Sequence, residues 1–190
     1  MLAEPWKQTF TEVVASHRYA GSMRQASLDA RLGDWTSALT EVVVTTCERA
    51  GWVAASKSSL LQSLPERRKE YFGLDVTAFE PGSGWRFPVA AIELENDAKD
   101  DRIAYSLWKV LAVRARLRVV FCYRKEPQAA GGLVAKVGRS VIGALSHEER
   151  LGLMGDVLVV VGTRSTAGTF PHDFFRWFRL ERNDGAFARL

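Results

Sequence analysis

The sequence predicts an α/β fold with a central mixed β-sheet flanked by helices. Amphipathic helical segments fill the first 50 residues, and apolar runs typical of buried strands recur at 87–94, 117–123 and 156–162. A helical segment separates each of these runs from the next, which is the order that favours a sheet with helices packed on it. With 190 residues, 47% of them apolar and 25% charged, the chain is predicted to form one domain with a sizeable core.

Residues 1–65 are predicted to form a helical support region. Between residues 5 and 19, apolar side chains recur at spacings of three and four, which predicts an amphipathic helix that begins near a proline. A second helix is predicted with Asp34 as its N-cap and Gly51 as the glycine after its C-terminus. In residues 52–65, serines favour turns and leucines favour a short helix, and both alternatives stay open.

Residues 66–165 are predicted to form the α/β core. Its expected elements are a basic helical segment at 66–71, strands at 71–79 and 87–94 joined by a turn at 81–84, a helix from Ile103 to Arg114, a strand at 117–123, a helix that opens at Gly131 and ends in exposed charges at 147–150, and a strand at 156–162. Asp100 or Asp101 is expected to cap the helix that follows the second strand. Residues 166–190 are predicted to form an edge strand or hairpin, because aromatic residues alternate with arginines there.

Composition limits the classes of function. The two cysteines, Cys47 and Cys122, are too few for a disulfide framework and have no zinc-ligand spacing. The N-terminal segment carries charges where a signal peptide would be apolar, and no run of about 18 apolar residues occurs, so we expect a soluble cytoplasmic protein without a membrane partner. The net charge of +4 comes from residues 96–190, which permits contact with a polyanion such as nucleic acid.

Three acids form the main candidate site. Glu93 and Glu95 are two residues apart at the end of a predicted strand, so they share one face of the sheet. Asp75 joins them if the strands at 71–79 and 87–94 are neighbours. Converging carboxylates raise one another's pKa, and a divalent cation relieves that cost. Oxygen ligands without His or Cys select Mg²⁺ or Mn²⁺, either of which suits phosphodiester hydrolysis. The alternative is that these acids only face water.

This pattern resembles the PD-(D/E)XK nuclease superfamily, which is restriction-endonuclease-like in fold. Its members place an acid on one strand and an E-x-K or E-x-E pair on the next, and here these positions correspond to Asp75 in GLDVTAF and to Glu93 and Glu95 in VAAIELEN. Glu95 stands where the lysine is usual. In several branches the lysine has moved to the following helix, and Lys109 in SLWKVL matches that arrangement. Glu70 matches an accessory acid that recurs on the helix before the first core strand, although Glu66 could serve instead.

The resemblance implies a metal-dependent endonuclease that hydrolyses phosphodiester bonds in DNA. Asp75, Glu93 and Glu95 would bind Mg²⁺ or Mn²⁺, and Lys109 would assist the attacking water. Because restriction-type enzymes are often dimers, a homodimer is compatible with it. The alternative is a catalytically inactive module that keeps the nuclease fold to bind nucleic acid or a protein partner. A third alternative, a small-molecule hydrolase, would need a deep apolar pocket.

Other candidate sites are weaker. The three histidines have no partner at a useful spacing for a nucleophilic triad, and the glycine-containing turns match neither a P-loop nor a dinucleotide fingerprint. Arginines gather around the strand at 117–123 and alternate with aromatic residues in the C-terminal segment. Arginines combined with aromatic rings can hold phosphates and stack on bases, although solvated surface positions account for them equally well.

Overall fold

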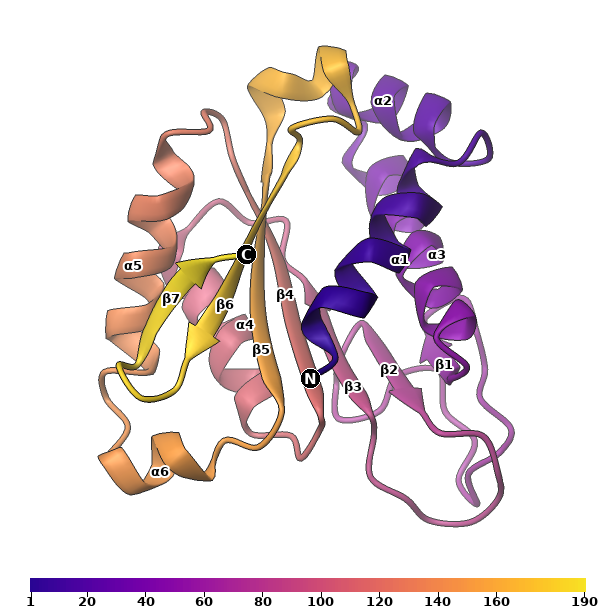
Figure 1. The fold of residues 1–190 in the computed structure, drawn as a ribbon. Coiled ribbons are helices and arrows are strands. Elements are labelled where there is room, and N and C mark those ends of the chain that lie inside the picture. The colour runs from indigo at the N-terminus through magenta and orange to yellow at the C-terminus, as the bar shows by residue number, and fades with distance from the viewer.

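A computed structural model describes residues 1–190 and contains one seven-stranded mixed sheet between two helical layers, which confirms the predicted α/β class (Figure 1). The helices are α1 (Ala3–Ala15), α2 (Ala20–Leu28), α3 (Leu32–Arg49), α4 (Asp100–Leu111), α5 (Ala129–Val141), α6 (His147–Gly152) and the 3₁₀ helix η1 (Arg164–Thr169). The strands are β1 (Val53–Ser56), β2 (Val76–Phe79), β3 (Ala90–Leu94), β4 (Leu117–Arg124), β5 (Asp156–Thr163), β6 (Phe175–Glu181) and β7 (Ala186–Arg189).

The strands lie side by side in chain order. The pairs β3–β4 and β4–β5 are parallel, and every other pair is antiparallel. Each parallel pair is joined through a helix, α4 or α5, as a parallel connection requires. Because β3, β4 and β5 run in one direction, their carboxyl ends lie at one edge of the sheet, and the antiparallel β2 begins beside the end of β3.

The helices cover both faces of the sheet. Helices α1 and α3 pack on one face, with α2 against α3 and η1, and α4 and α5 pack on the other face (Figure 1). Side chains alternate along β4, so that Val119 and Phe121 face the first layer while Val120 and Cys122 face the second. Burial on both faces explains why the central strands have continuous apolar sequences. None of the helices combines the length and apolar character that crossing a bilayer requires.

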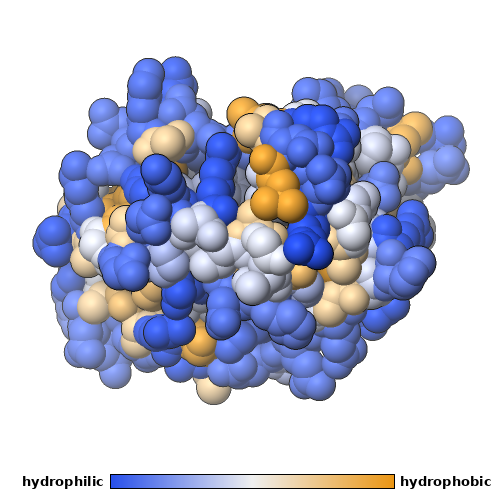
Figure 2. Space-filling model, turned by 90° about the horizontal axis from the view of Figure 1, so that it is seen from above, coloured by the Kyte–Doolittle hydropathy of each residue, from blue (hydrophilic) through white to orange (hydrophobic).

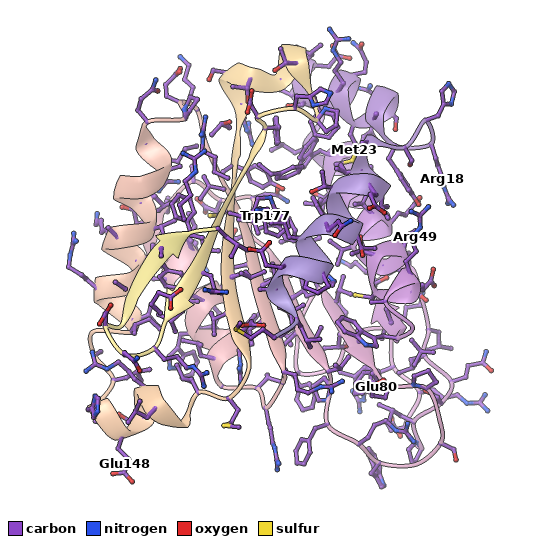
Figure 3. The ribbon with its side chains drawn as sticks, in the orientation of Figure 1. Arg18, Met23, Arg49, Glu80, Glu148 and Trp177 are labelled. Atoms are coloured by element: carbon purple, nitrogen blue, oxygen red, sulfur yellow. The ribbon has the colours of Figure 1, made fainter.

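Aromatic packing and a distant carboxylate hold α1 in place. The Phe10 ring lies 5.2 Å from that of Phe121 and 5.3 Å from that of Trp177, which lies between the sheet and α1 (Figure 3). Asp156, at the start of β5, accepts hydrogen bonds from the backbone N–H groups of Leu2 and Ala3 at 2.5 and 3.0 Å. These are N–H groups that the first turn of a helix leaves without partners, so Asp156 acts as an N-cap supplied by the sheet.

The end of α3 follows the prediction, but its start does not. Gly51 has φ +83°, and the N–H groups of Gly51 and Trp52 donate to the carbonyls of Glu48 and Cys47, the two bonds of a Schellman motif. Asp34 is not the N-cap, because the helix begins at Leu32 and Asp34 lies in its first turn. An acid there still interacts favourably with the helix dipole. Helix α2 was not predicted, since only two of its residues are buried.

Two segments before β3 differ from the prediction. Residues 53–56 form neither a turn nor a helix but the strand β1, because pairing with β2 overrides local preference and extends the sheet into the region expected to be helical. Residues 66–71 are not helical either. The Tyr71 hydroxyl donates to the carbonyl of Glu66 and accepts from the N–H of Arg68, so this segment wraps around a side chain. Consequently β2 begins only at Val76.

Later elements differ mainly at their ends. Lys99 is the N-cap of α4, and Asp100 and Asp101 lie in its first turn instead of capping it. Helix α5 begins two residues before Gly131. The charged segment at 147–150 is a separate helix, α6, because Ser146 and Glu149 form a capping box that starts a new helix. The C-terminal segment is the hairpin of β6 and β7, one of the two forms predicted.

Candidate functional site

The structure brings Asp75 and Glu93 together. Asp75 immediately precedes β2 and Glu93 lies in β3, and the antiparallel pairing of these strands places the start of one beside the end of the other. The Asp75 N–H donates to Glu93 Oε1 at 3.3 Å, and Asp75 Oδ2 accepts a hydrogen bond of 2.8 Å from the N–H of Leu94. The predicted pairing of the two strands that carry these acids is therefore confirmed.

Lys109 reaches the same point from α4. Its Nζ lies 2.8 Å from Glu93 Oε2 and also donates to the carbonyl of Gly73 at 2.8 Å. Gly73 has φ +65°, a conformation that glycine adopts without strain, and this turn presents its carbonyl to the lysine. One ammonium group thus links the loop before β2, the strand β3 and the helix α4.

The packing of α4 explains this arrangement. Ile103, Leu107 and Val110 form the buried stripe that holds the helix on the sheet. Ser106 and Lys109 lie one helical turn apart beside this stripe, and Ser106 Oγ donates to Glu95 Oε2 at 3.1 Å. Because α4 contacts both glutamates, Glu93 and Glu95 share the face of the sheet that α4 covers, as their spacing of two predicts.

Burial raises the pKa of both carboxyl groups of the site. Glu93 is only 5% exposed, and burial raises the pKa of its carboxyl to about 7, although the Lys109 ammonium acts to lower this pKa. Burial also raises the pKa of Asp75, where the N–H of Leu94 and the charge of Lys109 act in the opposite direction. Two acids that are costly to ionise therefore lie beside one ammonium, and an added positive charge would stabilise both carboxylates.

Glu95 and Glu70 are placed differently from the prediction. The carboxylate oxygens of Glu95 accept hydrogen bonds from the N–H of Asp97 at 2.7 Å and from Ser106. No group of three or more Asp, Glu, His or Cys side chains in the chain is arranged to hold a metal ion, so the expected convergence of three carboxylates is not formed. Glu95 faces α4 as Glu93 does, but its two oxygens are engaged by Asp97 and Ser106 instead of joining Asp75. Glu70 is exposed outside any helix, and its charge acts to raise the pKa of Asp75.

The remaining donors fit a hard cation in their chemistry. Asp75 and Glu93 offer carboxylate oxygens only, which suits Mg²⁺ or Mn²⁺ better than zinc. Asp75 Oδ1 takes no hydrogen bond from the protein, while Glu93 Oε2 is held by Lys109. The structure therefore supplies a pair of acidic ligands with an adjacent ammonium, in place of the predicted trio.

The predicted arginine cluster separates into different places. Arg116 lies at the amino end of β4, away from Asp75, and pairs with Glu80. Arg118 is buried beneath α4. Arg124, at the carboxyl end of β4, pairs with Asp100 at the start of α4, and Lys136 contacts the same carboxylate at 2.7 Å. That end of the parallel strands faces upward in Figure 1, and the face seen in Figure 2 is largely hydrophilic with small separate apolar spots.

Sequence reasoning missed two groups that complete the site. Ser106 is one helical turn before Lys109, a spacing that could have identified it once Lys109 was a candidate. The carbonyl of Gly73 carries no signal of its own, because any residue has one; only the turn formed by the chain before β2 places it beside the lysine.

Comparisons with known proteins add no information about function. No family model matches the chain, and neither the curated proteins nor the solved structures gave a match.

Proposed function

We propose that this protein is a metal-dependent nuclease that hydrolyses phosphodiester bonds in DNA, with Asp75 and Glu93 as ligands for Mg²⁺ or Mn²⁺. The observation that carries the proposal is the contact of 2.8 Å between Lys109 Nζ and Glu93 Oε2 directly beside Asp75. Two carboxylates with raised pKa values and one ammonium group come from three separate elements, an arrangement that is typical of functional sites. The resemblance to the PD-(D/E)XK superfamily assigns the same roles to these positions.

Each residue has a specific part in this proposal. A bound Mg²⁺ would polarise a phosphoryl oxygen and lower the pKa of a bound water. Asp75 and Glu93 would hold the ion, and Lys109 would donate to the attacking oxygen and stabilise negative charge on the phosphate. Glu95 positions α4 through Ser106, so that Lys109 stays over Glu93. Glu70 adds negative charge around Asp75.

A cleavage assay tests the proposal. Purified protein is incubated with supercoiled plasmid, single-stranded DNA and RNA, in Mg²⁺, in Mn²⁺ and in chelator. We expect cleavage of DNA only with metal, reduced at least ~100-fold in Asp75→Ala. Glu80→Ala is the matched control, because Glu80 is the acid at the opposite end of β2 (Figure 3). Full activity in Asp75→Ala, or cleavage by wild type in chelator, contradicts the proposal.

A second candidate is a catalytically inactive module of the same fold that binds nucleic acid or a protein partner. The hydrogen bonds that occupy both oxygens of Glu95 favour it, because they leave two acids where three were expected. Calorimetric titration with Mn²⁺ separates the candidates. One site that disappears in Asp75→Ala supports the nuclease, whereas no binding by correctly folded wild type supports the inactive module.

A further inference from the structure

Three aromatic side chains lie near Lys109 in the fold, two on its own helix and one beside the glycine that it contacts, and all three are exposed to solvent. Tyr105 and Trp108 lie on α4, four residues and one residue before Lys109, and their ring centroids are 6.0 Å apart with planes inclined by 31°. Phe72 precedes Gly73, whose carbonyl accepts a hydrogen bond from Lys109. The exposed fractions are 61% for Phe72, 55% for Tyr105 and 54% for Trp108. These three residues are called the aromatic platform below.

The platform is not needed for packing. Helix α4 is held by a different stripe, that of Ile103, Leu107 and Val110, and Tyr105 and Trp108 lie on the side of the helix away from it. Phe72 has φ +59°, a left-handed conformation that residues with a side chain rarely adopt, yet the chain has an exposed aromatic residue there. Rings at these positions gain little from the fold, so their exposed faces are available to a partner.

The charges near the platform favour a polyanion as that partner. Arg102 is exposed on α4 one turn before Tyr105, and the exposed segment 67–69 before Phe72 contains only basic residues, of which Arg68 pairs with Glu66 while the other two have no ion pair. Exposed aromatic rings combined with basic side chains are the means by which proteins bind single-stranded nucleic acid, because each base has a face that can stack on a ring. In a duplex those faces are covered by neighbouring base pairs, so the platform would have nothing to stack on.

We propose that the aromatic platform stacks the unpaired bases of single-stranded nucleic acid and places the adjoining phosphate beside Asp75, Glu93 and Lys109. This inference rests on the proposed function and specifies its substrate class as single strands or unpaired segments. The two rings on α4 take neighbouring bases, and Phe72 contacts the strand on the other side of Lys109. Arg102 and the basic segment 67–69 contact the phosphates that flank the site.

Binding measurements in chelator test this inference without interference from cleavage. Fluorescence anisotropy compares a labelled oligothymidine of about 12 nucleotides with a duplex of the same length. We expect wild type to bind the single strand more tightly than the duplex, and Trp108→Ala to weaken single-strand binding by ~10-fold. Trp108→Phe keeps a ring and should restore most of the affinity. Trp85→Ala is the matched control, because Trp85 is 76% exposed at the opposite end of the β2–β3 pair.

Three results would overturn the inference. These are equal affinity for single strand and duplex, single-strand affinity unchanged in Trp108→Ala, and loss of a dimer in Trp108→Ala during sedimentation, which would assign the rings to an interface between copies. The two proposals can fail separately. Metal-dependent cleavage with unchanged oligonucleotide affinity in Trp108→Ala overturns the platform alone. Ring-dependent binding without cleavage of any substrate overturns the hydrolytic proposal alone.

Discussion

Two charged side chains are buried beneath α4 on adjacent strands, and their charges are neutralised in opposite ways. Glu93 of β3 is 5% exposed and Arg118 of β4 is 4% exposed. Arg118 Nε donates to the carbonyls of Val110 and Val113, both at 3.1 Å, and Nη1 donates to that of Met154 at 2.6 Å. Its partners are therefore backbone carbonyls, two at the end of α4, where the helix dipole is negative, and one in the loop before β5. Glu93 instead contacts an ammonium group and has a second acid beside it.

This difference separates a charge with fixed backbone partners from a charge whose partner can move. The carbonyls around Arg118 are fixed by the backbone, and no carboxylate is paired with this residue, so its charge holds the end of α4 on the sheet. Glu93 has a partner at the tip of a flexible lysine side chain, while the nearby carboxylate of Asp75 acts to raise its pKa. Its negative charge is incompletely neutralised, so a further positive charge nearby would stabilise this carboxylate.

The largest effect is expected from removing the structural charge. Arg118→Ala leaves a cavity and carbonyl groups without donors, so the free energy of unfolding should fall by about 3–5 kcal/mol. Urea denaturation followed by circular dichroism measures this change. Arg116→Ala is the matched control, since Arg116 is an exposed neighbour paired with Glu80, and should cost less than about 1 kcal/mol. If Arg118→Ala does not fold, Arg118→Met is measured instead. This variant retains the side-chain volume, so its free energy of unfolding should lie between that of wild type and that expected for Arg118→Ala. Equal costs for Arg116→Ala and Arg118→Ala would refute the structural role.

The second effect is a dependence of stability on pH that arises from the ionisation of Glu93. Its pKa is about 7 in the folded chain and 4.5 when exposed, so folding favours the protonated carboxyl. The contribution of Glu93 to the free energy of unfolding is fully present below pH 4.5 and is lost as pH rises through about 7. The shift corresponds to on the order of 3 kcal/mol in metal-free protein. Glu93→Gln should remove this part of the dependence, measured by urea denaturation across that range in chelator. An unchanged pH profile in Glu93→Gln would contradict it.

The third effect concerns the movable partner of Glu93. Lys109→Met removes a positive charge that competes with a metal ion, so Mn²⁺ affinity at about pH 8 should rise by ~5- to ~10-fold, or about 1 kcal/mol. DNA cleavage should fall by ~100-fold in the same variant, because the ammonium no longer assists the attacking oxygen. Calorimetry and the plasmid assay measure the two changes. Loss of both metal binding and cleavage would mean that Lys109 organises the carboxylates rather than competing with the metal.

The elements that were predicted well are those that their own local sequence determines. The apolar runs of β4 and β5 and the glycine after α3 depend on local composition, and each lies within one or two residues of its expected place. Helix α2 and strand β1 were missed, because α2 buries only Met23 and Ala26 and β1 forms by pairing with β2. Segment 66–71 has helical composition, but the Tyr71 hydroxyl takes up its backbone groups.

The residues of the candidate site also fall into those that could be predicted from the sequence and those that could not. Asp75 and Glu93 could be selected from the sequence because the expected pairing of their two strands brings them together, and Lys109 because the resemblance to the PD-(D/E)XK superfamily directs attention to the following helix. The engagement of Glu95 could not be predicted, since the residue lies one position beyond β3, where the alternation of faces no longer fixes the side chain. The partners of Arg118 were equally hidden, because they are backbone carbonyl groups, which any residue has.

The smallest effect decides what Glu95 does. Its carboxylate accepts from the N–H of Asp97 and from Ser106, so Glu95→Gln keeps an acceptor and should cost about 0.5–1 kcal/mol of stability. If Glu95 only positions α4, Mn²⁺ affinity should fall by less than ~10-fold, whereas Asp75→Asn should reduce it by more than ~100-fold. Calorimetry on both variants makes the comparison. Equal losses would mean that Glu95 leaves Ser106 to become a third ligand, and Ser106→Ala would then strengthen metal binding because the competing hydrogen bond is gone.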